Sequence, residues 1–230
     1  MGSHTRADLA WPVPGGLLER FGLEPGEIEA RSRARARELV GGRFAGVTAD
    51  LAAAMVYAAG DPDLAAEVTV GPGSVEHAIE ALGAGAPVLL DVAMLRAGVR
   101  LPAERRLAVA VQAPGADVLA RDSGTTRTSA GVSLLWSGFG RGGVVVIGNA
   151  PTALLAVLDL ARAAGPPACV IATCPGFTGA AESKQALIDS GLPHVAVRGS
   201  RGGTGVAAAA LNFLLSRTGG SWLSSDGSDG

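Results

Sequence analysis

The sequence predicts a single α/β domain of three layers, α/β/α, around a doubly wound and mostly parallel sheet. Hydrophobic residues make up 48% of the 230 residues, aromatic residues only 4%, and 34 residues are glycine. That composition is typical of tightly wound α/β proteins with many short turns. Apolar segments also alternate with helical ones, which indicates right-handed βαβ units. Several of these apolar segments are uninterrupted, as expected for parallel strands buried on both faces.

The expected strands and helices alternate along most of the chain. Strands are expected at Glu67–Val70, Pro87–Leu90, Arg106–Gln112, Val144–Ile147, Ala168–Thr173 and Val195–Arg198. Helices are expected at 27–40, 49–60, 74–83, 127–138, 151–164, 180–190 and 205–216. Ligands of such sheets bind beyond the carboxyl ends of the strands, so the loops that follow the strands are the expected site.

The α/β domain is expected to span residues 15–217. Residues 1–14 are interpreted as tag residue and an N-terminal arm, because the opening Met1-Gly2-Ser3-His4 resembles expression-vector sequence. Residues 218–230 are polar and low in complexity, and we expect this tail to be disordered.

Charge and hydropathy exclude several classes of protein. The formal net charge of −2 argues against a general binder of nucleic acid or of an anionic membrane. Mean hydropathy is +0.33, yet no unbroken apolar run reaches the roughly 20 residues that a membrane span needs. Only Cys169 and Cys174 are present and no secretory signal is visible, so we expect a soluble cytoplasmic protein. A structural role for both cysteines is favoured over a redox or metal role, and no metal site is predicted.

The turn Gly148-Asn149-Ala150-Pro151-Thr152 lies between an expected strand and an expected helix. Pro151 suits the first turn of a helix, where its missing N–H costs nothing. Backbone N–H groups at that helix start would point toward an incoming anion or carbonyl oxygen. The turn therefore predicts an anion site, with an ordinary strand-to-helix connection as the alternative.

Two further loops repeat this pattern of glycine turn and helix start. Residues 175–184 contain Ser183 and Lys184, and residues 198–204 contain Arg201, Gly202 and Gly203. Glycine turns with nearby Arg and Lys favour anion binding. Their spacing matches neither a Walker loop nor the dinucleotide fingerprint, so a small molecule with several carboxylates is the expected ligand.

These segments together resemble the precorrin-8X methylmutase family of cobalamin biosynthesis. The resemblance covers residues 25 to 216 in a consistent order. It lies in Ala84–Asp91, Gly124–Arg127, Gly148–Leu154, Gly179–Lys184, Val197–Gly199, Arg201–Gly203 and Ala207–Asn212.

The resemblance implies a homodimer that binds a corrinoid tetrapyrrole with several acetate and propionate arms. It also implies movement of a methyl group between adjacent macrocycle carbons, with no metal or organic cofactor. An arginine guanidinium matches a carboxylate in shape, which agrees with the cationic loops. The expected substrate-binding residues are Arg127, Gly148, Asn149, Ala150, Thr152, Ser183, Lys184, Arg201, Gly202 and Gly203.

The chain departs from the family at the catalytic position. The family carries a histidine in a helical pattern close to Arg-Met-Ile-His-Ala-Cys-Gly, and the matching stretch here places Ala54 at the arginine and Tyr57 at the histidine. A histidine titrates near pH 6.5, whereas a tyrosine titrates near pH 10 and is a poor acid at neutral pH. Tyr57 is therefore the candidate catalytic residue, as acid, hydrogen-bond donor or stacking partner of a flat ligand, with packing as the alternative. Thr128 and Ser200 also replace a serine and a basic residue that are usual in the family.

Three functions follow from this pattern. The chain is a methylmutase that uses Tyr57, a paralogue that rearranges or cyclises another conjugated molecule in secondary metabolism, or a non-catalytic tetrapyrrole binder. In each case the partner is a small molecule, with neither nucleic acid nor membrane. A homodimer with the site near its interface is expected, because the three glycine loops are too open to enclose a large ligand.

Other charged residues have simpler explanations. The four arginines between positions 31 and 37 spread around a helix, so we expect them to pair with Glu27, Glu29 and Glu38 in solvent. His77 is expected on the surface, and His194 in a structural or exposed position.

Overall fold

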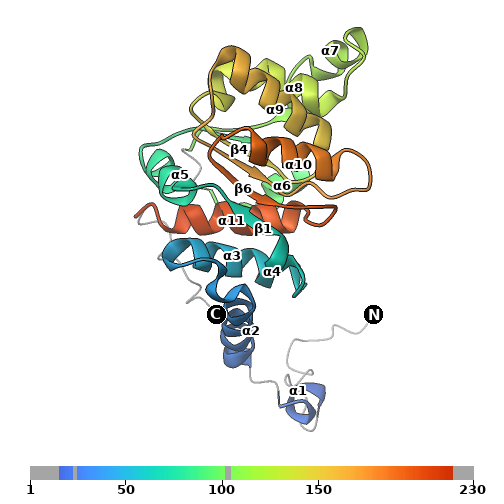
Figure 1. Cartoon of the computed structure of the whole chain (residues 1–230). Coiled ribbons are helices and arrows are strands. Elements are labelled where there is room, and N and C mark those ends of the chain that lie inside the picture. The colour runs from blue at the N-terminus through green and yellow to red at the C-terminus, as the bar shows by residue number, and fades with distance from the viewer. Residues whose placement is uncertain (1–15, 23–24, 102–104, 220–230) are drawn as a thin grey trace, which may run out of the picture.

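The computed structural model describes residues 16–22, 25–101 and 105–219, and its centre is a six-stranded sheet (Figure 1). The strands are β1 (Val68–Val70), β2 (Val88–Leu90), β3 (Leu107–Val109), β4 (Val144–Ile147), β5 (Cys169–Ala172) and β6 (His194–Val197). Their order across the sheet is β1-β6-β5-β4-β2-β3. Every neighbouring pair is parallel except β1 with β6, which confirms the predicted doubly wound, mostly parallel sheet.

Helices connect the strands and cover both faces of the sheet. They are α1 (Leu17–Arg20), α2 (Pro25–Val40), α3 (Gly46–Ala59), α4 (Leu64–Glu67), α5 (Ser74–Gly83), α6 (Ala93–Gly98), α7 (Ala116–Asp122), α8 (Arg127–Leu135), α9 (Pro151–Ala164), α10 (Ala180–Asp189) and α11 (Thr204–Ser216). Short 3₁₀ segments lie at Gly41–Arg43 and Ala110–Gln112, and a π-helical turn lies at Trp136–Gly140.

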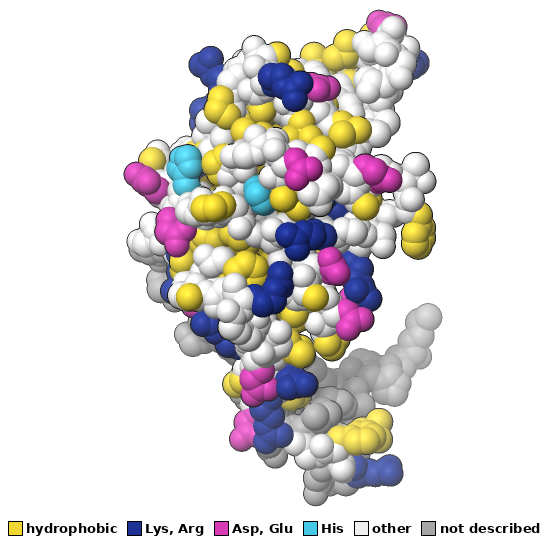
Figure 2. Space-filling view, in the orientation of Figure 1, with side chains coloured by type: hydrophobic (Ala, Val, Ile, Leu, Met, Phe, Trp, Pro, Cys, Tyr) yellow, Lys and Arg dark blue, Asp and Glu magenta, His cyan; other side chains and the backbone are white. Residues whose placement is uncertain are grey.

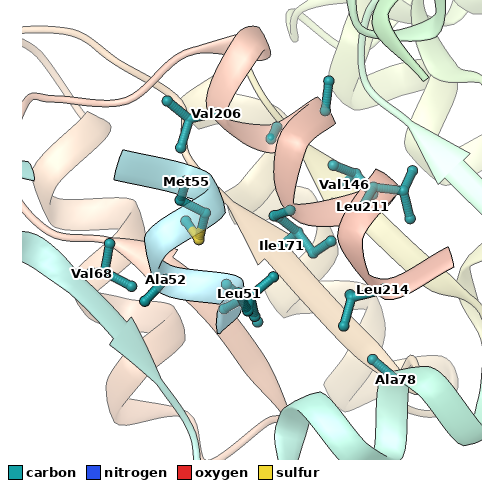
Figure 3. Packing of buried hydrophobic residues seen from close by; sticks show 14 of the residues in the cluster. Leu51, Ala52, Met55, Val68, Ala78, Val146, Ile171, Val206, Leu211 and Leu214 are labelled. Atoms are coloured by element: carbon teal, nitrogen blue, oxygen red, sulfur yellow. The ribbon is translucent and has the colours of Figure 1, made fainter. Parts of the chain in front are cut away.

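Two hydrophobic cores lie on the two faces of the sheet. On one face, α5, α6 and α11 contact the strands, α3 packs on the outside of α11, and α2 packs on α3 (Figure 1). One buried cluster there contains Leu51 and Met55 of α3, Leu211 and Leu214 of α11, and Ile171 of β5 (Figure 3). On the other face, α8, α9 and α10 cover the sheet. The three-layer α/β/α prediction is therefore confirmed, with α2 and α3 added outside one layer.

The structure differs from the predicted elements in four places. The strand expected at 106–112 is only Leu107–Val109, followed by the 3₁₀ turn, and the helix expected to reach 138 gives way to the π turn at Trp136. The short helices α1, α4, α6 and α7 were not predicted, because four to seven residues are too few to show a helical period. The edge strand β1 runs antiparallel, where alternation alone implied a parallel strand. The predicted arm at 1–14, and residues 220–230 of the predicted tail, lie outside the described residues.

Surface charges are mixed in sign on the face that Figure 2 presents. On α2, Arg31 pairs with Glu27, Arg33 with Glu29 at 2.6 Å, and Arg35 with Glu38 at 2.9 Å, as predicted. Arg37 reaches Asp50 of α3 at 3.3 Å. Across the described ranges, no helix combines the length and apolar character that crossing a bilayer requires.

The strand order creates one switch point in the sheet. From β2 the chain moves outward to β3, and then returns to place β4 on the opposite side of β2. The loops that follow β2 and β4 therefore diverge at this point. Sheets of this kind bind ligands in the crevice at such a switch point.

Candidate functional site

Asp91 is buried at the switch point, directly after β2. Its Oδ2 accepts hydrogen bonds from the backbone N–H groups of Asn149 at 2.7 Å and Ala150 at 2.9 Å, and its Oδ1 accepts one from Val92 at 2.9 Å. Burial raises the pKa of Asp91, and the hydrogen bonds from the backbone N–H groups oppose that rise. The carboxylate thus holds the turn between β4 and α9 from the neighbouring loop.

This contact corrects the prediction of free N–H groups at the start of α9. The N–H groups of Asn149 and Ala150 already have an anionic partner, and Pro151 has none to offer. Gly148 packs closely on α11 instead, since a Cβ there would lie 3.1 Å from the Cα of Thr204. The backbone of this turn is therefore an internal joint, while the side chains of Asn149 and Thr152 remain exposed.

The loop at 198–204 is hydrogen-bonded to the end of β5 and to the loop that follows it. The N–H of Gly203 donates to the carbonyl oxygen of Thr173 at 2.6 Å, and the Thr173 hydroxyl donates to the carbonyl oxygen of Gly203 at 2.9 Å. Gly202 has a φ of +135°, and a Cβ there would lie 2.0 Å from the Thr173 carbonyl oxygen. Gly176 donates to the carbonyl oxygen of Ser200 at 3.0 Å. Only glycine fits at 202, so the loop at 198–204 is tied to the end of β5.

Ser183 and Lys184 do not face solvent, contrary to their predicted role in substrate binding. Both are buried on α10. The Ser183 hydroxyl donates to the carbonyl oxygen of Ala180 at 3.2 Å, and Nζ of Lys184 donates to the carbonyl oxygen of Arg201 at 2.9 Å. Burial lowers the pKa of Lys184. Sequence reasoning placed these residues beside the glycine turn correctly but could not show which face of α10 they occupy.

Arg201 is one of two arginines, with Arg198, that the last loop presents at the surface. Its Nε lies 3.2 Å from Oδ2 of Asp61, and its Nη2 lies 3.0 Å from Oδ2 of Asp63. Asp61 and Asp63 follow α3 directly, and the sequence analysis did not identify them. The side chain of Arg201 is 44% exposed, so these are surface ion pairs of small net energy that a ligand carboxylate can replace.

Tyr57 lies at the end of α3, 38% exposed, in a cavity of about 420 Å³ between α2 and α3. Arg31, Arg35 and Asp61 line the same cavity. The Arg33 guanidinium lies over the Tyr57 ring, 5.2 Å from its centroid. The glycine loops do not line this cavity, and the Asp61–Arg201 pair is what joins it to them.

Hydroxyl groups join the starts of α8 and α9. Thr126 Oγ1 lies 2.9 Å from Thr152 Oγ1 and 3.0 Å from Ser129 Oγ, and it accepts a hydrogen bond from the backbone N–H of Ser129. Arg127 is exposed at the first position of α8. Arg127 and Thr152 therefore lie at one end of the carboxyl edge.

Both cysteines and one of the two described histidines are buried. Both cysteines are buried and free, and burial raises the pKa of Cys169 to about 12. His77 is exposed on α5, and His194 is buried in β6 with Nδ1 2.8 Å from the carbonyl oxygen of Leu192. Within the described part of the chain, no group of three His, Cys, Asp or Glu residues is placed to hold a metal ion.

Comparison with known proteins assigns the fold and these loops to one family. The family model of precorrin-8X methylmutase matches residues 27–217. The chain belongs to the precorrin-8X methylmutase family. A precorrin-8X methylmutase of Sinorhizobium sp. is 43% identical over 178 residues, which cover 75% of this chain and 84% of the relative. A cobalt-precorrin-8 methylmutase of Methanothermobacter thermautotrophicus is 36% identical over 193 residues, covering 82% of this chain and 91% of that one.

Solved structures agree with this assignment. The precorrin-8X methylmutase of Thermus thermophilus has a TM-score of 0.73 at 27% identity, covering 84% of this chain and 97% of its own. A precorrin-8X methylmutase related protein has a TM-score of 0.75 at 27% identity, and the match covers 80% of this chain and 98% of that one. Membership of the precorrin-8X methylmutase family makes the chain an isomerase of the methylmutase type, which confirms the resemblance and the enzyme class predicted from the sequence.

The most informative site residue that sequence reasoning missed is Asp91. The sequence did offer a signal, because Asp91 directly follows an uninterrupted apolar strand, and side chains at that place face the ligand edge of a parallel sheet. Asp61 and Asp63 gave a weaker signal, as acidic residues just beyond the helix that carries Tyr57.

Proposed function

We propose that this chain is a precorrin-8X methylmutase in which Tyr57 works at the position of the family's histidine. The match of residues 27–217 to the family carries the proposal. In the reaction, the bond from a methyl group to one macrocycle carbon breaks and a bond to the adjacent carbon forms. Substrate and product have the same atoms, so the step needs no co-reactant.

The substrate is proposed to lie across the cavity at Tyr57 and the neighbouring loop at 198–204. Arg201 is the group suited to a substrate carboxylate, because its guanidinium is partly exposed and already holds two carboxylates. Asn149, Thr152 and Arg127 have exposed side chains that can contact further polar arms of the macrocycle. Lys184 and Ser183 are excluded from direct contact by their burial.

Tyr57 is proposed to act on the macrocycle through its hydroxyl, as a proton or hydrogen-bond donor to a nitrogen or carbon whose charge changes during the shift. Arg33 covers one face of the ring, so the edge and hydroxyl are the parts suited to contact the substrate. Arg31 and Arg35 line the same cavity, and each is paired with a glutamate of α2.

The active form is proposed to be a cytoplasmic homodimer with the site near its interface. Phe177 supports association or ligand cover, because its side chain is wholly exposed on the loop between β5 and α10. Met94, on α6, is 70% exposed. Exposed apolar side chains at the edge of the sheet where ligands bind favour contact with a partner chain or a ligand that covers them.

Turnover of precorrin-8X by wild type, Tyr57→Phe and Tyr57→His from pH 5 to 9 tests the proposal. Tyr57→Phe keeps the ring and its contact with Arg33, so binding should survive while turnover falls about 10²–10⁴-fold if proton transfer is involved. Tyr57→His should retain or raise activity, with a pH profile moved toward about 6.5. His77→Gln, at an exposed histidine of α5, is the control for the profile.

The other outcomes separate the alternatives. Equal turnover by wild type and Tyr57→Phe removes the hydroxyl from the mechanism. Binding of precorrin-8X by wild type without conversion would support the non-catalytic binder. If wild type does not bind precorrin-8X and Tyr57→His gains no activity, the pocket serves another conjugated molecule, in keeping with the changes at Ala54 and Ser200.

A further inference from the structure

Lys184 is a charged side chain with no exposed surface, in the middle of α10. Among the described residues, no carboxylate lies within ion-pair distance of it, and its Nζ donates to the backbone carbonyl oxygen of Arg201 at 2.9 Å. Taking an ammonium group out of water costs several kcal/mol unless a partner compensates it. The hydrogen bond to Arg201 offsets part of this cost, and it lies next to the candidate site.

The backbone that Lys184 holds is fixed on its other side as well. Thr173 exchanges two hydrogen bonds with Gly203, and Gly202 lies against the Thr173 carbonyl too closely for any side chain. Residues 201–203 are thus held by hydrogen bonds on two sides, from Lys184 of α10 and from Thr173 at the end of β5. The three-residue stretch has little freedom to shift.

The side chain of Arg201 leaves this fixed stretch toward Asp61 and Asp63, beside the cavity of Tyr57. A long arginine side chain reaches a defined place only if its backbone is held. A misplacement of about 1 Å at a binding group can cost 10²-fold in rate.

We propose that Lys184 is a positioning residue, which fixes the Arg201 backbone so that the guanidinium is presented to a substrate carboxylate. Lys184 does not touch the substrate. Arg201 does, and the effect of Lys184 passes through it. The inference rests on the proposed function for its substrate, but the fixed backbone is a property of the free protein.

The first experiment measures the dissociation constant for precorrin-8X in wild type, Lys184→Met, Arg201→Ala and the double variant. Lys184→Met keeps a long apolar stem and removes the cost of burying a lone ammonium group, so the melting temperature should hold or rise. The dissociation constant should rise about tenfold or more in each single variant, as for loss of a hydrogen bond to a charged group. The double variant should lose no more than Arg201→Ala alone, because both changes act through one guanidinium.

Gln185→Met is the matched control, since Gln185 is the exposed neighbour on the same helix. Its dissociation constant should equal that of wild type. Lys184→Arg, which keeps a cationic donor, should restore part of the affinity and serves as the second variant if Lys184→Met does not fold. Additive losses in the double variant, or an unchanged dissociation constant in a folded Lys184→Met, would overturn the proposal.

Limited digestion with trypsin separates this inference from the proposed function, because it needs no substrate. Trypsin cleaves after arginine, and a fixed backbone at Arg201 should resist it. Lys184→Met should be cut after Arg201 at least severalfold faster, while cleavage after the exposed Arg141 stays unchanged as an internal control. Faster cleavage with no precorrin-8X binding by wild type would overturn only the proposed function. Unchanged cleavage would show that Lys184 does not hold this backbone.

Discussion

Asp91 illustrates how a single buried residue shapes the edge of the sheet. Its two carboxylate oxygens accept hydrogen bonds from the backbone N–H groups of Val92, Asn149 and Ala150. These bonds join the loops after β2 and β4 across the switch point. A carboxylate with this many donors is suited to hold the two loops together. It also occupies the place at the start of α9 where an external anion would otherwise bind.

Asp91→Asn tests this joint. An amide offers one acceptor oxygen in place of two, and its NH₂ group faces backbone donors, so at least one buried N–H loses its partner. The free energy of unfolding should fall by about 1–3 kcal/mol. Urea titration measures the change, and Asp122→Asn at an exposed position of α7 should leave the midpoint unchanged.

The same pair of proteins has an expected pH dependence. Because burial raises the pKa of Asp91 above the ordinary value of 3.8, the folded state binds the proton more readily than the unfolded chain in the window above pH 3.8. Stability from this group therefore falls as the pH rises through that window. The free energy of unfolding of wild type should exceed that of Asp91→Asn by more at pH 4.5 than at pH 7. A difference that is smaller at pH 4.5 than at pH 7 would contradict a raised pKa of Asp91.

The contacts of some single residues could be predicted from the sequence, and those of others could not. The glutamate partners of the α2 arginines were predictable, because pairs three or four residues apart on a helix meet whatever else the chain does. The burial of Cys169 followed from its place in an apolar strand. The partners of Asp91 and Lys184 did not follow, since each lies on another loop whose position depends on the order of the strands.

At the scale of elements, strongly patterned segments were predictable and short ones were not. The helix at 151–164 has the predicted bounds, because Pro151 marks its start and an apolar strand precedes it. The antiparallel direction of β1 depends on pairing with β6, more than a hundred residues later in the chain. No local pattern carries that information.

The packing of α3 on α11 gives a prediction at this scale. Leu211 has no exposed surface and lies in the core that joins α11, α3 and the sheet (Figure 3). Leu211→Ala should lower the free energy of unfolding by about 2–5 kcal/mol, through lost apolar burial and the cavity left behind. Leu155→Ala, at a leucine of α9 that is 45% exposed, should change it by less than about 1 kcal/mol. Calorimetry and urea titration of the three proteins measure this, and equal losses would show that α3 and α11 do not share a tight core.

At the scale of the whole molecule, three loops that are distant in the sequence meet because parallel strands end at one edge. The helices α9, α10 and α11 all begin there, from both faces of the sheet. The sequence could predict this meeting from the fold class alone. What it could not predict is that the backbone N–H groups of Asn149, Ala150 and Gly203 already have hydrogen-bond partners within the chain.

The last prediction concerns association of the whole chain. The loops of one chain leave Phe177 wholly exposed, and burying a phenylalanine side chain contributes about 1.5–3 kcal/mol, so association that covers such groups is favoured. We expect sedimentation equilibrium at micromolar concentration to give twice the 22.8 kDa of one chain. An interface built on apolar contacts should persist in 0.5 M salt, where pairs between exposed charges are largely screened. A single species of monomer mass at micromolar concentration would contradict the homodimer, and a dimer lost only in salt would place surface charges at its interface.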